Sequence, residues 1–168
     1  GHHYQCSLQQ ENTAFPDFRK TLDYSGYTEG WALYTESLGK ELGLYTDPYQ
    51  YFGMLSMEMH RAIRLVVDTG LHSKGWTREQ AIQYSLDNEA ETEDAIISEV
   101  ERYMANPGQA LSYKIGQLKI RELRAKATKE LGNKFDIKEF HNQVLATGSI
   151  PLNLLEEKID HWIDASKN

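Results

Sequence analysis

The sequence predicts an all-α domain, a multi-helix bundle of roughly six to eight helices. From about residue 28 onward the apolar residues recur at three- and four-residue spacing, and no segment shows the polar–apolar alternation of a half-buried strand. Three of the four prolines stand where such a helical pattern begins, a position at which the missing N–H of proline costs no hydrogen bond. The 168 residues suit one domain of ordinary size, without an obvious linker.

Two helices are predicted in the first half of the chain. Helical spacing over residues 28–42 predicts a helix that ends at Gly43, because glycine tolerates the left-handed turn that closes a helix. A longer helix is predicted over residues 48–71, opened by Pro48 and ended at Gly70. Its apolar stripe, which should face the core, consists of Phe52, Leu55, Met59, Ile63, Val66 and Val67.

Further helices are predicted after residue 76. Thr77 can cap a short helix that ends near Leu86, with Gln80 answering three residues later. The acidic start of residues 87–104 favours another helix, since carboxylates stabilise a helix N-terminus. The remaining predicted helices cover residues 109–131, 137–146 and 151–165.

Composition and charge exclude several classes of protein. The chain carries 18 Lys and Arg against 25 Asp and Glu, a net charge of −7, which argues against a nucleic-acid partner. The central apolar segment Leu65–Val67 is closed by Arg64 and Asp68, far short of the roughly 20 residues that a membrane span needs. A single cysteine, Cys6, permits no internal disulfide and leaves the compartment open.

The helix predicted over residues 48–71 aligns ionisable residues on one face. Arg61, Arg64, Asp68 and His72 follow one another at i, i+3, i+7 and i+11 beside the apolar stripe. This pattern indicates an ion-pair network or a ligand site. The simpler interpretation is an Arg64–Asp68 ion pair, worth only about 0.2–0.5 kcal/mol when exposed.

A second group of candidate residues lies near the N-terminus. His2, His3 and Cys6 offer metal-binding atoms, and Glu29 is followed seven residues later by Glu36 on the same helix face. In helical zinc hydrolases, two histidines from one helix and a carboxylate from a second helix bind the metal and leave one position for water. Because an affinity tag can also leave Gly-His-His at a terminus, the spacing alone keeps both interpretations open.

Five successive blocks resemble a large bacterial family known only as a domain of unknown function, number 885, many of whose members are exported lipoproteins. The blocks are Gly1–Gln5, Glu29–Glu36, Arg64–His72, Pro107–Gly116 and Phe140–Leu152. Their order and spacing match over essentially the whole chain. The family in turn resembles the helical zincin metallopeptidases whose third ligand is a glutamate, so the resemblance implies the C-terminal half of such a bundle.

The resemblance also implies metal-binding roles. His2 would be the second zinc ligand, with His3 as the alternative, and Glu29 would be the third. Glu36 would orient a ligand histidine through a hydrogen bond. Asp68 is assigned, like Glu36, to the residues that surround the ligands without binding the metal.

Three further residues would act on a peptide substrate. Tyr113 would donate a hydrogen bond to the oxyanion of a tetrahedral intermediate. Arg64 and His72 would hold carboxylate or carbonyl groups of the peptide. Structural roles stay open beside these, because Tyr113 can cap the core near a helix start and Glu29 can simply favour the helix dipole.

One departure from the family pattern bears on activity. In family members a His-Glu pair and a short insertion ending in Pro precede the Gly-His-His block, so that the site is a stretched HExxH helix. These residues would lie upstream of Gly1, and we therefore expect the chain to be a C-terminal part of a larger protein, cut within its metal-binding helix. Alone it should bind Zn²⁺ weakly or not at all and be inactive, since a positioned base is missing.

The intact parent is then expected to be a zinc-dependent peptidase of the bacterial cell envelope or periplasm, although a cytoplasmic location stays open. The alternative hypothesis is a non-catalytic helical domain that binds a peptide or a partner protein in the same groove. The two residues directly before Gly1 distinguish the hypotheses, because only a His-Glu pair completes the metal site.

Overall fold

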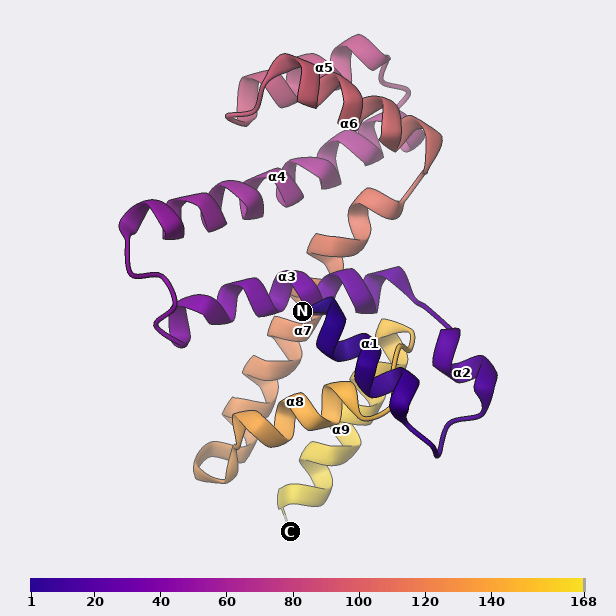
Figure 1. Ribbon diagram of the computed structural model, residues 1–168, viewed down its shortest axis with the longest axis vertical. Coiled ribbons are helices and arrows are strands. Elements are labelled where there is room, and N and C mark those ends of the chain that lie inside the picture. Colours follow the sequence, from indigo (N-terminus) through magenta and orange to yellow (C-terminus); the bar gives the residue numbers. More distant parts are fainter. Residues whose placement is uncertain (168) are drawn as a thin grey trace. The chain divides into compact units, whose positions relative to one another are not determined.

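The computed structural model describes residues 1–167 and divides them into two compact units (Figure 1). One unit combines residues 1–35 with the chain from Ile115 onward, and the other comprises residues 36–114. All regular secondary structure within residues 1–167 is helical, so the predicted all-α class is confirmed. No helix among these residues is both long and apolar enough to cross a lipid bilayer.

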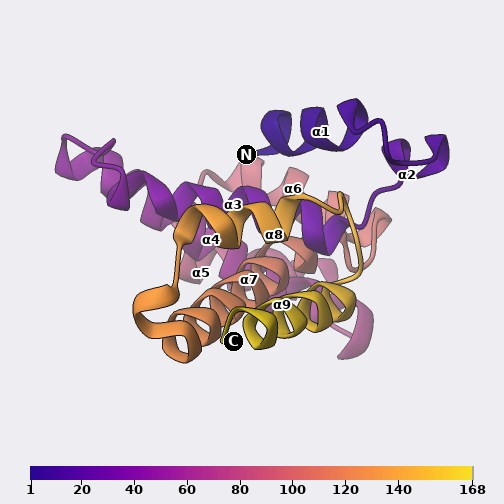
Figure 2. The same cartoon turned by 90° about the horizontal axis from the view of Figure 1, so that it is seen from below.

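The first unit contains the helices at both ends of the chain. They are α1 (His2–Glu11), α2 (Asp17–Thr21), α3 (Ser25–Glu41) up to Thr35, α7 (Gln109–Leu131) from Ile115, α8 (Ile137–Leu145) and α9 (Leu152–Lys167), with a 3-10 turn at Gly132–Lys134. Helix α9 runs alongside α7 (Figure 2). The ion pairs that join them are Lys119–Glu156, Lys126–Asp160 and Lys167–Glu130.

Aromatic and aliphatic side chains form the core of this unit. The buried residues include Tyr27, Trp31, Tyr34, Ile120, Leu123, Phe140, Val144, Leu155, Ile159 and Ile163. The Tyr27 hydroxyl donates a hydrogen bond of 2.7 Å to the carbonyl oxygen of Val144. Burial raises the pKa of Tyr27 well above its ordinary value, so its hydroxyl remains a neutral donor.

Three glycines allow α3 and α7 to touch through their backbones. A Cβ atom on Gly30 would overlap the Cα atom of Gly116, and one on Gly116 would overlap the carbonyl oxygen of Gly26. Because both obstacles are backbone atoms, no side-chain movement can relieve the overlap. The glycines therefore seat the helix that carries Glu29 against the long helix of its unit.

Helix α1 buries glutamines in place of apolar residues, which explains why hydrophobic spacing did not predict it. Its buried side chains are Gln5 and Gln9. Gln9 Nε2 donates to the carbonyl oxygens of Arg19 and Leu22, both at 2.8 Å, and Gln9 Oε1 accepts from the Ser149 N–H at 2.8 Å. These bonds satisfy the carbonyl oxygens of Arg19 and Leu22 at the end of α2 and one N–H in the loop before α9.

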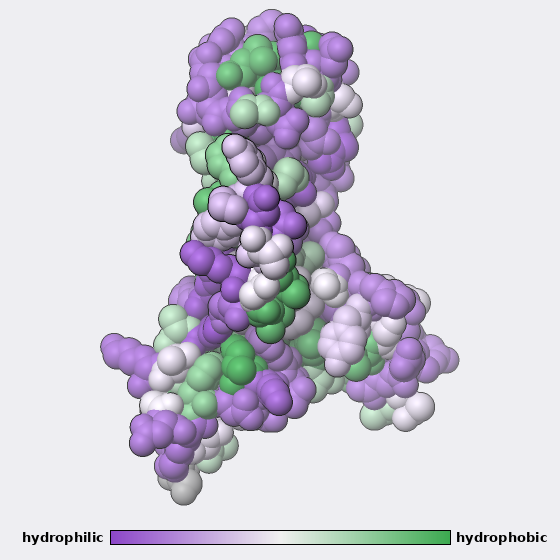
Figure 3. Space-filling model, turned by 60° about the vertical axis from the view of Figure 1, so that its left-hand side comes forward, coloured by the Kyte–Doolittle hydropathy of each residue, from purple (hydrophilic) through white to green (hydrophobic). Residues whose placement is uncertain are grey.

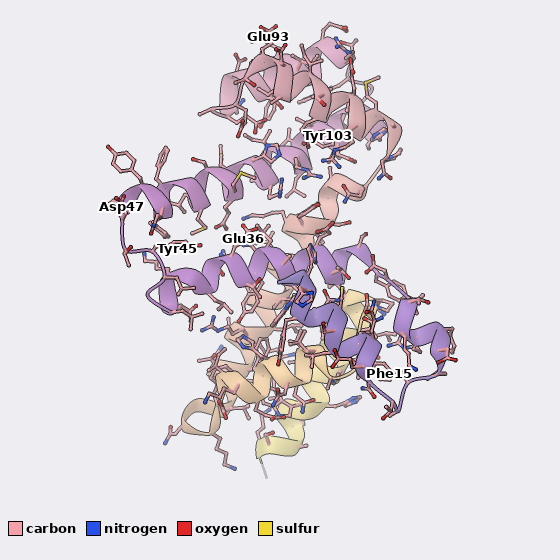
Figure 4. All side chains as sticks on the ribbon, viewed as in Figure 1. Phe15, Glu36, Tyr45, Asp47, Glu93 and Tyr103 are labelled. Atoms are coloured by element: carbon pink, nitrogen blue, oxygen red, sulfur yellow. The ribbon has the colours of Figure 1, made fainter. Side chains whose placement is uncertain are left out.

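The second unit is built around α4 (Pro48–Ser73), α5 (Arg78–Asn88) and α6 (Glu93–Ala105). Asp47, labelled in Figure 4, caps α4 together with Gln50, and the predicted cap of α5 by Thr77 and Gln80 is confirmed. The core consists of Ile63, Val67, Ala81, Ile82, Ile96, Val100, Tyr103 and Ala110.

Two predicted helix boundaries in this unit are wrong. Helix α4 continues through Gly70 to Ser73. The glycine at position 70 does not end the helix but allows close packing, since a Cβ atom there would overlap the indole of Trp76. The helix predicted over residues 87–104 begins only at Glu93, since α5 extends into its first residues.

The apolar stripe of α4 is only partly buried, in contrast to the prediction. Ile63 and Val67 lie in the core, because α5 and α6 pack around this part of the helix. The other residues of the stripe, Phe52, Leu55, Met59 and Val66, are exposed. Figure 3 shows hydrophobic groups open to solvent among the hydrophilic ones on the face that it displays.

Candidate functional site

His2 and Glu29 meet in the first unit, although 27 residues separate them. His2 lies at the start of α1 and Glu29 in the second turn of α3, and His2 Nε2 is 3.1 Å from Glu29 Oε2. The side chains are 47% and 17% exposed. Two donor atoms about 2.1 Å from one tetrahedral Zn²⁺ would be roughly 3.4 Å apart, so this pair has nearly the spacing that a shared ion requires.

The donors fit zinc in kind but not in number. Imidazole nitrogen and carboxylate oxygen are ordinary zinc ligands, and a catalytic zinc usually has three protein ligands. Within residues 1–167, no group of three or more His, Cys, Asp or Glu side chains is placed to hold an ion. His3 is exposed and Cys6 half-buried, and neither adds a third donor. The chain thus brings together two residues of types that can bind zinc, and the described residues add no third to them.

A buried acceptor lies one turn from His2 along α1. Gln5 is 3% exposed, and its Nε2 atom lies 3.5 Å from Thr28 Oγ1 on α3. Its Oε1 atom has no hydrogen-bond partner within the described residues. Because buried polar atoms are normally paired, this oxygen, one turn from His2 along α1, is able to accept a further hydrogen bond.

The remaining predicted site residues belong to the second unit. Glu36 is exposed on α3, two turns after Glu29 (Figure 4). Arg61, Arg64, Asp68 and His72 lie on α4, and Tyr113 is half-buried in the second turn of α7. The residues that the sequence predicts for one site therefore belong to both units.

Arg64 is a deeply buried charged side chain of the second unit, 2% exposed. Its guanidinium lies 4.5 Å from the ring centroid of Tyr113 and 5.0 Å from that of Tyr103. The Nη2 group donates to Gln109 Oε1 at 3.2 Å, while Nε has no partner within the described residues. The Arg64–Asp68 ion pair that the spacing allowed does not form.

Asp68 has a different role, because it holds the turn that leads into α7. Its two carboxylate oxygens accept the backbone N–H of Gly108 at 3.0 and 3.2 Å. Gly108 has a φ of 81°, which suits glycine in particular, and Gln109 is the first residue of α7. Asp68 therefore positions the helix turns that carry Gln109 and Tyr113.

His72 makes a structural contact. Its Nε2 atom lies 2.9 Å from the carbonyl oxygen of Tyr103, near the end of α6. Figure 4 labels Tyr103 at this position. The contact ties the last turns of α4 to the last turns of α6.

Helix α6 adds three residues that sequence reasoning did not single out. Arg102 donates to both carboxylate oxygens of Glu99 at 2.6 and 3.0 Å, and the Tyr103 hydroxyl donates to Glu99 Oε2 at 2.8 Å. The guanidinium of Arg102 also lies 5.3 Å from the Tyr103 ring centroid. The i,i+3 and i,i+4 spacings from Glu99 were a usable signal for these contacts.

The pKa of Glu99 predicts part of the acid sensitivity of the fold. Burial alone would raise this pKa, but hydrogen bonds from Arg102 and Tyr103 outweigh burial and lower it from 4.5 to about 2. A depressed carboxyl pKa stabilises the fold above the unfolded value, and the contribution is lost as the pH falls from about 4.5 through 2. In urea titrations over this range, Glu99→Gln should show a smaller fall in unfolding free energy than the unchanged chain. The control Glu91→Gln, at an exposed position, should fall as steeply as the unchanged chain; equal slopes for all three would contradict the prediction.

Comparison with known proteins agrees with the helical architecture. Residues 1–159 match the family described as "Bacterial protein of unknown function (DUF885)". The chain is 50% identical to a protein whose crystal structure is described as that of "the putative lipoprotein from Colwellia psychrerythraea", with a TM-score of 0.96. The match covers 98% of this chain and 28% of the other. No curated protein matches the chain.

Proposed function

The chain belongs to the DUF885 family of bacterial proteins of unknown function. We propose that it is the C-terminal part of a larger zinc-dependent peptidase. The observation that carries the proposal is the 3.1 Å contact between His2 Nε2 and Glu29 Oε2. It supports a metal site because two residues from separate helices present the donor types that zinc prefers. The Oε1 atom of Gln5, buried without a partner in the described residues one turn from His2 along α1, supports it further.

The proposal assigns His2 and Glu29 to the metal, with His3 as the alternative histidine and Glu36 as a residue that orients a ligand. Zn²⁺, when bound, would polarise the scissile carbonyl and lower the pKa of a bound water. The proposed role of Tyr113 is a hydrogen bond to the developing oxyanion. Arg64 and His72 would bind carboxylate or carbonyl groups of the peptide.

The remaining zinc ligand and the general base are proposed to come from a part of the protein outside this chain. The support is that the chain spans only 28% of the length of the Colwellia psychrerythraea protein that it resembles. By the same comparison the proposed location is the bacterial cell envelope. Without a base to accept a proton from water, the 168-residue chain alone should not cleave peptides.

A second candidate function is a non-catalytic helical domain that binds a peptide or a partner protein. The observation that favours it is the row of exposed apolar residues on α4, where Phe52 is 64% exposed, Met59 49% and Leu55 42%. Exposed apolar side chains that follow one another on a helix are typical of interaction surfaces.

Zinc content of the longer protein tests the metal assignment. We expect about one Zn²⁺ per chain after dialysis, and an affinity reduced by more than roughly a hundredfold in Glu29→Gln, because a ligand is lost. Competition with a chelator followed by metal analysis measures both values. Comparing His2→Ala with His3→Ala identifies the histidine that binds.

The matched control is Glu41→Gln, an exposed glutamate at the end of the same helix, which should keep its zinc. Full zinc content in Glu29→Gln would refute the assignment and favour the binding domain.

A further inference from the structure

Three arginines converge on two tyrosine rings in the second unit. The guanidinium carbons of Arg61 and Arg64, both on α4, each lie 4.5 Å from the ring centroid of Tyr113 on α7. Arg64 and Arg102 lie 5.0 and 5.3 Å from that of Tyr103. We call Arg61, Arg64 and Arg102 the arginine cluster. It is unusual in a chain with a net charge of −7, because like charges that lie close together repel one another.

The cluster has too few acceptors within the described residues. Glu99 pairs with Arg102 at 2.6 Å, and its carboxylate also attracts Arg64 electrostatically. Within the described residues, neither Arg61 nor Arg64 makes a direct ion pair with a carboxylate. Arg64 makes one hydrogen bond, to the amide oxygen of Gln109. The tyrosine rings attract the cations, but they do not accept the in-plane N–H groups of guanidinium as an oxygen does.

Burial makes the missing acceptor costly. Arg64 is 2% exposed, and its Nε atom is buried without a partner in the described residues. Burial lowers the pKa of Arg64, and the neighbouring Arg61 and Arg102 act in the same direction. A buried cation is normally paired with an anion, so an anionic ligand would relieve this cost.

The geometry of the donors favours a carboxylate. The N–H groups of guanidinium lie in one plane and form a fork that matches the two oxygens of a carboxylate. The other two arginines add positive charge close to Arg64. Asp68 fixes the turn before Gln109 through the N–H of Gly108. The site is therefore held by packing and hydrogen bonds before any ligand arrives.

We propose that the arginine cluster binds the C-terminal carboxylate of a peptide, with Arg64 as its principal partner. This inference deepens the proposed function, on which it rests for the identification of the ligand as a peptide. The proposed specificity is for the C-terminal end of a peptide. The binding itself requires neither a metal nor residues outside this chain.

Binding of a short peptide to the 168-residue chain in the presence of a chelator tests the proposal. The probes are N-acetyl-trialanine with a free carboxylate and the same peptide with a C-terminal amide, measured by isothermal titration calorimetry. The acid should bind at least roughly tenfold more tightly than the amide, since charge-assisted hydrogen bonds are lost in the amide. Arg61→Gln and Arg102→Gln should each weaken binding of the acid several-fold.

Variants of two other positions complete the test. Arg64→Lys keeps the charge but loses the fork, and should weaken binding roughly tenfold while circular dichroism shows a folded chain. Arg78→Gln is the matched control, because Arg78 pairs with Glu101 outside the cluster, and its affinity should equal that of the unchanged chain. Arg61 and Arg102 are less deeply buried than Arg64, so their variants should fold. If Arg64→Lys fails to fold, the Arg61→Gln and Arg102→Gln affinities test the proposal instead.

Several results would overturn the proposal: no binding of the acid, equal binding of acid and amide, or tighter binding of inorganic phosphate than of the peptide acid. Its failure can be told apart from failure of the proposed function. Peptide binding without zinc is measured on this chain, whereas the zinc ligands are tested by the metal content of the longer protein.

Discussion

Replacing Gly116 with alanine should destabilise the first unit by about 3 kcal/mol or more, because the new methyl group has nowhere to go. Its Cβ atom would overlap the carbonyl oxygen of Gly26 and the Cα atom of Gly30, so α3 and α7 would have to separate. Glu29 lies next to Gly30, and the separation would also displace it. Urea denaturation followed by circular dichroism measures the loss of unfolding free energy.

The same substitution at Gly53 is the matched control. Gly53 lies within α4, and a Cβ atom there would meet nothing within 4 Å. Alanine has the higher helix propensity, so Gly53→Ala should stabilise the chain by about 0.5–1 kcal/mol. A Gly116→Ala chain that loses less than about 1 kcal/mol of unfolding free energy, the average cost of a point mutation, would contradict the backbone contact between the two helices.

Replacing Asp68 with alanine should cost about 2–3 kcal/mol of unfolding free energy. Asp68 is 2% exposed, and its loss leaves the N–H of Gly108 without its acceptor at the start of α7. Asp68→Asn retains one carbonyl oxygen and should lose about half as much. Because the first turns of α7 carry Gln109 and Tyr113, Asp68→Ala should also weaken binding of the peptide acid by the arginine cluster.

The exposed residue Asp87 provides the control for this change. Asp87→Ala removes the same charge from the surface of α5 and should alter stability by less than about 0.5 kcal/mol. If Asp68→Ala were as harmless as Asp87→Ala, Asp68 could not be the residue that holds the turn before α7.

The sequence predicts those elements that bury apolar residues with a regular period. Helix α7 ends at Leu131 as predicted, and Gly43 and Gly132 adopt the positive φ angles expected of helix ends. Hydrophobic spacing did not predict α1, because this helix buries Gln5 and Gln9. The family resemblance did imply a metal-binding helix at this place. Gly70 suggested a helix end because glycine often ends helices. Its actual role, close contact of its backbone with the Trp76 ring, is a tertiary feature that local spacing does not encode.

The candidate sites show the same division. Spacing and family resemblance singled out His2 and Glu29, and the structure brings them together, while their role as zinc ligands stays a proposal. The face shared by Arg64 and Asp68 was also visible in the sequence. Their partners were not, because Asp68 binds a backbone N–H 40 residues away and Arg64 stacks on rings from two other helices.

The most direct test of the zinc assignment is a crystal structure of the longer protein with data collected at the zinc absorption edge. We expect an anomalous peak about 2.0–2.2 Å from both His2 Nε2 and a carboxylate oxygen of Glu29. A peak bound by other residues, or the absence of any peak at this pair when zinc is present in the crystal, would contradict it.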